Sequence, residues 1–217
     1  MNDIVNGKKD KNIPSFNQFQ TKAVQRFNVS VKSNCLLVLD NNNIITSYLR
    51  YPDWDILSIK DKLMLLGSYL EHNDGFKAFT LIPSHHFRRA MKTSAHWADY
   101  ARRHFNSNLK NNLGFVPDYM FVIETSRNDY EHFHGVIDVR FASENTIRDI
   151  FKKTVFGCDY KTSPMNRVCW EPKCLYNPLG WISYCLKNNQ GNKSLVYMTN
   201  SLKKSVKIFY SETYHGK

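Results

Sequence analysis

Two neighbouring β-rich segments, residues 118–126 and 132–141, constrain the fold of this chain more than any other feature. They read DYMFVIETS and HFHGVIDVRF, and the link between them, RNDYE, is rich in turn-forming residues. Two strands joined by so short a link pair most readily as an antiparallel hairpin. The sequence therefore predicts an antiparallel sheet with this hairpin in it.

The elements around the hairpin predict an α+β fold, in which helices flank a central antiparallel sheet. Ser84 is expected to cap one long helix that ends near Gly114, and Ser143 to cap a later one. In chain order we expect a strand at 76–83, a helix at 85–113, the hairpin, a helix at 143–156, a strand at 166–174, a helix at 177–191 and a strand at 204–214.

The chain divides by composition into three parts. Residues 1–13 are polar and lysine-rich and are expected to be disordered, residues 14–75 form a helical extension of unknown role, and residues 76–217 form the main domain. The first residues lack the apolar segment of a secretory signal, and no apolar run approaches the ~18 residues of a membrane span. We therefore expect a cytoplasmic protein without a membrane partner.

Cysteines gather in the last third of the chain. Their spacing does not match the paired pattern of zinc ribbons, so buried reduced thiols are favoured over a zinc site, which stays open as an alternative. The residues are Cys158, Cys169, Cys174 and Cys185.

The formal net charge of +11 favours a polyanionic partner, and nucleic acid is the most common one. The alternative is a charge that is spread evenly for solubility. No phosphate-binding loop is present, so no nucleotide-driven motor is encoded. A basic face, or simply a solvated helix face, is expected from Arg88, Arg89, Lys92, Arg102, Arg103 and Lys110.

The histidines of the hairpin are the first candidates for chemistry. Side chains alternate along a strand, so His132 and His134 point to one side and Phe133 to the other. The preceding strand ends in Glu124, which a hairpin would place beside both imidazoles. Two imidazoles and a carboxylate can bind one metal ion. The alternative is two surface histidines and a strand that happens to end in a glutamate.

Tyr184 and Lys187 lie three residues apart on an expected helix, and this spacing puts them on one face. A tyrosine hydroxyl is a possible nucleophile, but its pKa of ~10 means that it needs help at neutral pH. The ammonium group of Lys187 would favour the phenolate. The alternative is an inward aromatic residue beside a solvated lysine. Similarly, Trp170 and Trp181 either stack on unpaired bases or belong to the core.

Together these pieces resemble the HUH endonuclease superfamily, named for its histidine–hydrophobic–histidine motif, and within it the rolling-circle replication initiators, or Rep proteins. HFH at 132–134 matches the metal motif, YCLK at 184–187 matches the tyrosine motif, and FTLIP at 79–83 is similar to the first family motif. The tyrosine follows the histidines, as in Rep proteins and single-strand transposases and unlike conjugative relaxases. The resemblance covers residues 76–190.

The resemblance implies a sheet related to the RNA-recognition fold and a metal-dependent nickase of single-stranded DNA. Tyr184 would form a 5′-phosphotyrosine link with support from Lys187, and Mn²⁺ or Mg²⁺ would be held by His132, His134 and Glu124. The partner would be single-stranded DNA at an origin, with helicase and polymerase supplied by the host. A single-strand transposase, a non-catalytic DNA-binding repressor and a nuclease that activates water are the alternatives. Contacts with DNA are expected from Arg88, Arg89, Lys92 and Trp181.

Overall fold

The structure, a computed structural model, describes residues 37–39, 45–47, 52–126, 130–157, 168–170, 175–189 and 192–215. The chain forms two compact units, Met1–Asp53 and Trp54–Lys217. In the first unit, β1 (Leu37–Leu39) and β2 (Ile45–Ser47) form a short antiparallel pair. The expected disorder of residues 1–13 and most of the helical extension expected before residue 52 lie outside the described residues.

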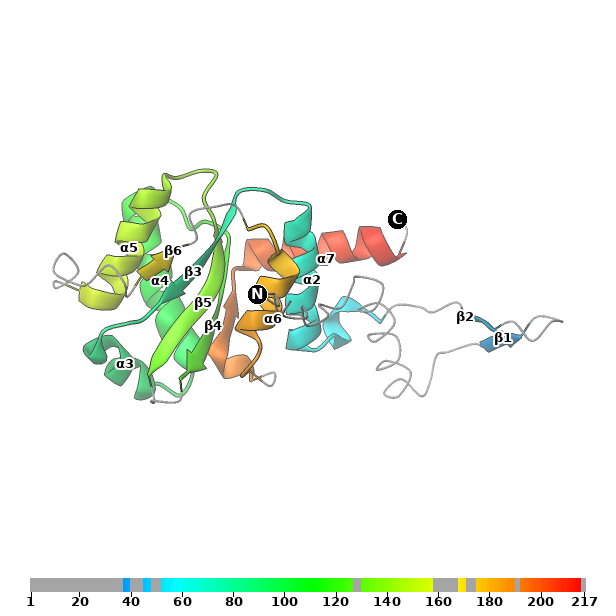
Figure 1. The fold of residues 1–217 in the computed structure, drawn as a ribbon, viewed down its shortest axis with the longest axis horizontal. Helices are drawn as coiled ribbons and strands as arrows, with labels where there is room; N and C mark the ends of the chain where they lie inside the picture. The colour runs from blue at the N-terminus through cyan, green and yellow to red at the C-terminus, as the bar shows by residue number, and fades with distance from the viewer. Residues whose placement is uncertain are drawn as a thin grey trace, which may run out of the picture. The chain divides into compact units, whose positions relative to one another are not determined.

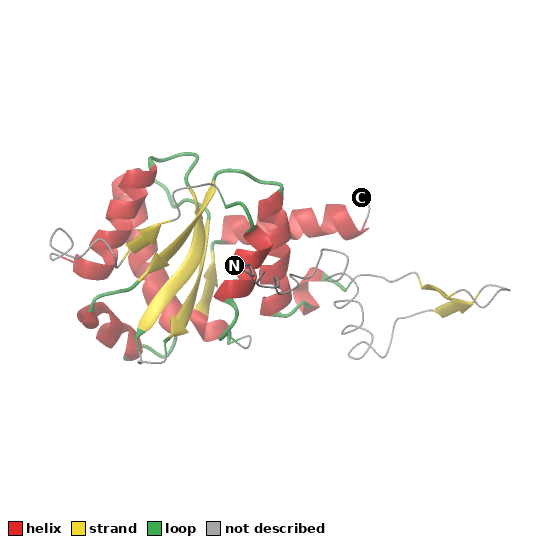
Figure 2. Cartoon of the chain, viewed as in Figure 1, coloured by secondary structure: helices red, strands yellow, loops and turns green. Residues whose placement is uncertain are grey.

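The second unit is built on a five-stranded sheet in the order β6-β3-β5-β4-β7, and every described pairing in it is antiparallel (Figures 1 and 2). This confirms the predicted α+β class with a central antiparallel sheet. The central strand β5 is almost entirely buried, which explains its apolar run. The strands are β3 (Phe76–Leu81), β4 (Tyr119–Thr125), β5 (Glu131–Asp138), β6 (Val168–Trp170) and β7 (Val196–Met198).

One face of the sheet packs against α3 (His85–Lys92), α4 (Trp97–Leu113) and α5 (Glu144–Phe156) in an aromatic core. Phe105 lies at its centre, with ring centroids 4.9 Å from Phe151 and 5.6 Å from Phe133. Large rings in edge-to-face contact stabilise a core beyond the area that they bury. Phe133, the residue between the two histidines, is therefore buried on this face, as predicted.

The other face carries α6 (Pro178–Cys185), which contacts β5, and α2 (Ile59–Glu71) packs on α6 and on α7 (Asn200–His215). The α2–α6 contact is close because Gly67 has no side chain. A Cβ there would lie 3.1 Å from the Cα of Leu179. The described part of the unit also has two short 3₁₀ turns, η1 (Trp54–Ile56) and η4 (Lys193–Leu195). Helix α2 lies within the stretch 14–75, and the predicted division of the chain at residue 76 stays a prediction.

The helix predicted over 85–113 is wrong in one respect, because the structure has two helices there. Ser84 and Gly114 cap them as expected. Between the two helices, the side chain of Thr93 donates to the carbonyl of Ala90, and the Ser94 hydroxyl accepts from the backbone N–H of His96. Such local side-chain bonds compete with helical ones and interrupt the helix. The expected basic face is therefore divided between α3 and α4.

The strand predicted over 204–214 is wrong, since these residues belong to α7. Leu202, Val206 and Tyr210 are all buried, and their spacing of four residues gives one helical face. The β-branched and aromatic residues of KSVKIFYSETY favoured a strand locally, but packing on this face decides the outcome. The last strand is instead the short β7.

The helix predicted over 177–191 is shorter than expected and ends at Cys185. It begins as predicted, because the side chain of Asn177 accepts from the N–H of Gly180 and Pro178 occupies the first turn. Residues 186–188 are turns, and Gly191 lies outside the described residues. Lys187 thus lies just beyond the helix that carries Tyr184.

Ser143 caps α5 as predicted, by accepting from the N–H of Thr146. The zinc alternative involves Cys158, Cys174 and the side chain of Cys169, which lie outside the described residues, while Cys185 is a buried free thiol. Of the helices that the structure describes, none combines the length and the apolar character needed to cross a bilayer.

Candidate metal centre and nucleophile

The register of the β4–β5 hairpin brings the three predicted metal ligands together. Glu124 on β4 lies directly opposite His132 on β5, and His134 lies opposite Val122. Directly opposed residues share a face of the sheet, and so do residues two apart on one strand. Glu124, His132 and His134 therefore face α6, and Phe133 faces the aromatic core.

The donor atoms of this cluster are close enough to share one ion. Glu124 Oε2 lies 3.3 Å from His132 Nε2 and 3.0 Å from His134 Nε2, and the three donor atoms lie within 4.8 Å of one another. Ligand atoms about 2 Å from a common cation are about 3 Å apart when they meet at right angles. The measured separations have this magnitude.

Two buried atoms, Glu124 Oε2 and His134 Nε2, meet at the centre of the cluster. Apart from their contacts within the cluster, neither has a polar partner among the described residues. The outer ring nitrogens do have contacts, since His134 Nδ1 lies 2.8 Å from Thr80 Oγ1 and His132 Nδ1 lies 3.3 Å from the Tyr130 carbonyl. Such contacts orient imidazoles toward a metal. The residues therefore fit a divalent cation, which would satisfy both orphaned atoms.

The charges of the cluster suit metal binding. Burial, followed by the neighbouring His132, lowers the pKa of His134 to about 4, although Glu124 opposes this. Burial raises the pKa of Glu124, but Lys187, His132 and Asn188 together outweigh it and lower the pKa overall. At neutral pH the cluster thus holds a neutral imidazole at His134 and an ionised carboxylate, the forms that bind metals.

The second carboxylate oxygen of Glu124 is held from the end of α6. Lys187 Nζ lies 3.3 Å from Glu124 Oε1, and the Asn188 amide donates to the same oxygen at 2.5 Å. Burial lowers the pKa of Lys187, but its interactions with Tyr184 and Glu124 raise it overall. One oxygen of Glu124 thus faces the histidines while the other is fixed by two donors.

Tyr184 lies over this cluster and reaches solvent. Its side chain is 44% exposed, and its ring centroid lies 5.1 Å from that of His134. Lys187 Nζ lies 3.7 Å from the centre of the Tyr184 ring, so one ammonium contacts both Tyr184 and Glu124. The structure therefore brings together all five predicted catalytic and metal-binding residues.

Trp181 connects α6 to the sheet. Its indole N–H donates to the carbonyl of Gly135 on β5 at 3.0 Å, and its ring stacks on Tyr184 with centroids 5.5 Å apart. It also contacts His134 edge to face. The half-buried Trp181 therefore supports the site. The side chain of Trp170 lies outside the described residues.

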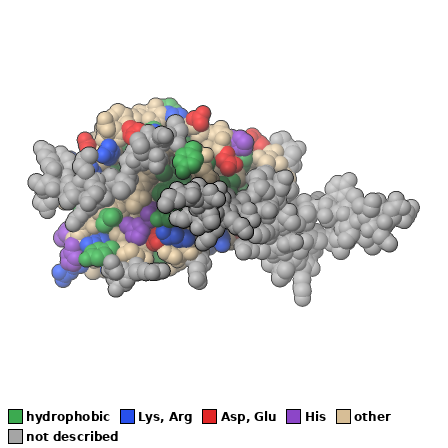
Figure 3. All heavy atoms as spheres, in the orientation of Figure 1, with side chains coloured by type: hydrophobic (Ala, Val, Ile, Leu, Met, Phe, Trp, Pro, Cys, Tyr) green, Lys and Arg blue, Asp and Glu red, His purple; other side chains and the backbone are tan. Residues whose placement is uncertain are grey.

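A hollow of about 470 Å³ opens beside the histidines. Tyr130 lines it, and the guanidinium of Arg88 lies 4.5 Å from the centre of the Tyr130 ring. Lys92 binds the buried carboxylate of Glu131 at 2.6 Å, and Arg89 is exposed on the same helix. Figure 3 shows histidine and basic side chains at the surface in the lower part of the view. Their predicted contacts with DNA stay a prediction.

Three residues of the site were not predicted from the sequence. Thr80 is the polar residue within the apolar run FTLIP, where alternation puts it on the histidine face. Asn188 lies four residues after Tyr184, a spacing that indicates the same helical face. Tyr130 contributes its backbone carbonyl and its ring, for which the sequence offers no signal.

The structure thus has the predicted antiparallel α+β fold, and it brings Glu124, His132 and His134 together in one cluster. No protein-family model matches the chain. No curated protein matches it. Among solved structures, the catalytic domain of the adeno-associated virus type 5 Rep protein is similar, with 13% identity and a TM-score of 0.41 over 63% of this chain and 98% of that domain.

Proposed function

We propose that this protein is a metal-dependent endonuclease that nicks single-stranded DNA and becomes linked to the 5′ end through Tyr184. The observation behind this proposal is that Tyr184, the ammonium group of Lys187 and the Glu/His/His cluster lie together on one face of the sheet. Lys187 contacts both Tyr184 and Glu124. Such a set serves phosphoryl transfer, which depends on positioning and charge neutralisation.

The reaction exchanges one phosphate ester for another. The Tyr184 hydroxyl loses its proton and attacks the phosphorus, so that a bond forms between phosphorus and the phenolic oxygen while the bond to the 3′ oxygen breaks. The leaving 3′ oxygen takes up a proton. Mn²⁺ or Mg²⁺, held by Glu124, His132 and His134, would supply a positive charge that polarises the phosphate. Attack by the free 3′-hydroxyl reverses the exchange and reseals DNA without a nucleotide.

Lys187 has two parts in this proposal. Its ammonium, which lies 3.7 Å from the centre of the Tyr184 ring, would neutralise negative charge on the phosphate during the attack. It also fixes Glu124 Oε1, which leaves Oε2 directed at the histidines. The position of Nζ between the two groups supports both parts.

We further propose that the protein initiates rolling-circle replication of a plasmid, phage or other mobile element in the cytoplasm. The free 3′-hydroxyl left by the nick can prime synthesis. Helicase and polymerase would be supplied by the host. The Rep-like order of the motifs, with Tyr184 after the histidines, supports this role.

The test is incubation of the chain with a library of labelled single-stranded oligonucleotides and Mn²⁺, followed by a denaturing gel and mass analysis. We expect a covalent adduct at Tyr184, and Tyr184→Phe should abolish it while DNA affinity stays near normal. Tyr176→Phe is the matched control, because Tyr176 is 88% exposed and lies away from the motif.

The outcomes separate the alternatives. Cleavage without an adduct would indicate a nuclease that activates water, and an adduct that survives in Tyr184→Phe would exclude Tyr184 as the nucleophile. Salt-sensitive binding without cleavage, across the whole library, would indicate a binding protein. If His132→Ala cleaves DNA as fast as the unmodified chain does, His132 is excluded as a ligand of the catalytic metal.

A further inference from the structure

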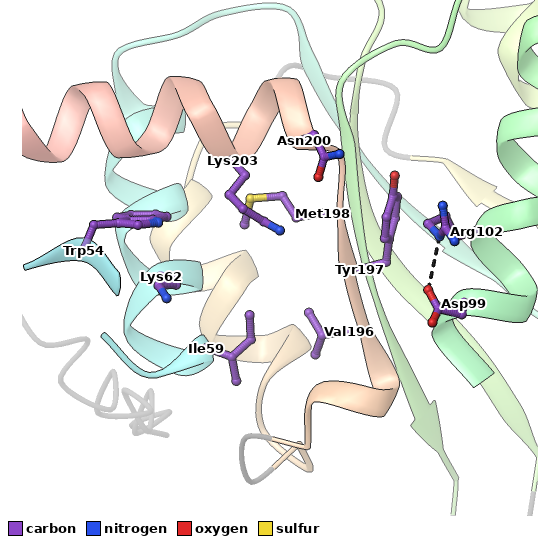
Figure 4. Close-up of a pocket in the computed structure, with 10 residues that line it drawn as sticks. All are labelled: Trp54, Ile59, Lys62, Asp99, Arg102, Val196, Tyr197, Met198, Asn200 and Lys203. Atoms are coloured by element: carbon purple, nitrogen blue, oxygen red, sulfur yellow. Dashed lines mark hydrogen bonds and ion pairs between the residues drawn. The ribbon is translucent and has the colours of Figure 1, made fainter. Parts of the chain in front are cut away.

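A second pocket, of about 320 Å³, lies at the outer strand β7 and is also lined from η1, α2, α4 and α7 (Figure 4). None of its lining residues belongs to the metal centre or to the tyrosine motif. Its volume is at the lower end of the range for small-molecule sites, ~300–1,000 Å³. The lining includes Trp54, Lys62, Asp99, Arg102, Tyr197 and Lys203.

Positive charge dominates the walls of this pocket. Lys62 comes from α2, Arg102 from α4 and Lys203 from α7, so three separate helices each supply a cation. The carboxylate among the lining residues, Asp99, is already bound to Arg102, with 3.2 Å between Oδ1 and Nε. Among the described residues that line the cavity, no further carboxylate faces the two lysines.

The surroundings increase this excess of positive charge. Burial lowers the pKa of Lys62, and Lys193, Lys203 and Lys207 lower it further, while Asp55 opposes them. The Oδ2 atom of Asp55 lies 3.5 Å from Nζ of Lys207, so this carboxylate is shared with another lysine. Like charges held around a cavity repel one another, and a bound anion would relieve the repulsion.

Trp54 and Tyr197 stand at opposite ends of the pocket, and both rings are largely packed against other residues (Figure 4). Trp54 is only 6% exposed and contacts Tyr210, while Tyr197 packs against Tyr119 and Phe121. Lys62 Nζ lies 5.4 Å from the Trp54 ring centre, and the Arg102 guanidinium lies 5.8 Å from that of Tyr197. Asn200 adds an amide to the lining. A phosphate group, which is anionic and accepts several hydrogen bonds, suits such cationic and polar walls.

We propose that this pocket is a second nucleic-acid site, which binds one nucleotide unit through its phosphate. Lys62 and Lys203 contact the phosphate, and the amide of Asn200 belongs to the same lining. The unit comes either from a DNA strand or from a free mononucleotide, which share this chemistry. The site does not depend on the metal centre.

The test uses the full chain with Tyr184→Phe and EDTA, so that no cleavage interferes. The probes are a fluorescein-labelled oligothymidylate, followed by anisotropy over a range of salt concentrations, and thymidine 5′-monophosphate, followed by calorimetry. The variants are Lys203→Gln and the double variant Lys62→Gln/Lys203→Gln. Lys204→Gln is the matched control, since Lys204 is the exposed neighbour on α7 that does not line the pocket.

We expect Lys203→Gln to weaken binding and to lower the salt slope by about 0.7, the contribution of one phosphate contact on a single strand. The double variant should lower it by about 1.4 on the same scale, and Lys204→Gln should change it less. Loss of oligonucleotide binding alone identifies a strand as the ligand, and loss of monophosphate binding identifies a free nucleotide. Equal effects of Lys203→Gln and Lys204→Gln on both probes would overturn the proposal, because α7 would then act only as a diffuse charged surface.

This result is separable from the nickase proposal. The adduct assay depends on Tyr184 and the histidines, whereas the binding assay is performed without the nucleophile and without metal. If no adduct forms but Lys203→Gln weakens binding more than Lys204→Gln does, the second site is supported and the nickase proposal is not. Lys62 is half-buried on α2, so thermal unfolding of the double variant checks that Lys62→Gln leaves the fold intact. Lys203 is exposed, so Lys203→Gln tests the pocket with less risk to the fold.

Discussion

The carboxylate of Glu124 shows how single residues set the chemistry of this site. It is buried, and its two oxygens contact different groups. Oε2 lies near the two histidines, and Oε1 contacts Lys187 and Asn188. A buried charge is tolerated only where such partners compensate for lost solvation. The residues that orient Glu124 therefore matter as much as the carboxylate itself.

Asn188 is expected to act as a positioning residue for this carboxylate. Asn188→Leu keeps a similar volume and removes the amide donor, so Glu124 Oε1 loses one of its two partners. We expect Mn²⁺ affinity to fall about 10- to 100-fold, the usual effect of losing an outer contact of a metal ligand. Calorimetric titration with Mn²⁺ measures this directly. Asn111→Leu, at an exposed position of α4, should leave the affinity unchanged, and an equal loss in both variants would contradict the role.

At the scale of elements, the β4–β5 hairpin links metal binding to folding. Its two strands hold all three proposed ligands. A ligand that binds only the folded state stabilises it, by about 2.7 kcal/mol when its concentration is 100 times Kd. We expect Mn²⁺ to raise the temperature of thermal unfolding and EDTA to reverse the effect. His132→Ala should lose this response, and an equal shift in that variant would speak against the cluster as the binding site.

The centre of the same hairpin depends on Gly135. A Cβ there would collide with the backbone carbonyl of Met120 and would lie 2.6 Å from the Phe79 ring. Because neither the neighbouring strand nor the packed ring can move freely, Gly135→Ala should lower the free energy of unfolding by about 1–3 kcal/mol or more. Urea unfolding followed by circular dichroism measures the loss. Asn145→Ala, an exposed change on α5, serves as the control, and a Gly135→Ala curve that matches it would disprove this account.

For the whole molecule, α2 is the support that places the tyrosine motif. It packs on α6, and its Leu63 and Leu66 are fully buried. Loss of one such leucine side chain costs about 2–5 kcal/mol, against a total stability of about 5–15 kcal/mol for a typical domain. A chain that begins at Trp54 should unfold cooperatively in urea, whereas one that begins at Phe76 should not. Cooperative unfolding of the shorter chain would show that α6 keeps its place without α2.

Residues 132–134 and the strand before them were predictable from the sequence because alternation along a strand is a local rule. It put His132 and His134 on one side and Phe133 on the other, and a short link made the hairpin partner of Glu124 foreseeable. The caps at Ser84 and Ser143 were equally local, since each depends on a side chain and the N–H three residues later. The fold class followed from the order of such elements.

Local patterns in the sequence therefore predicted the hairpin and the side of its strand on which the histidines lie. The register that sets Glu124 opposite His132 and the turn that carries Lys187 beyond the end of α6 depend on tertiary packing. The tertiary structure made a helix of residues 200–215 through burial on one side, broke the expected long helix at 93–96, and brought Thr80 and Asn188 to the ligands. It also assembled the basic pocket from Lys62, Arg102 and Lys203. These features join residues far apart in the chain, and their energies come from packing and charge between elements, which no local pattern records.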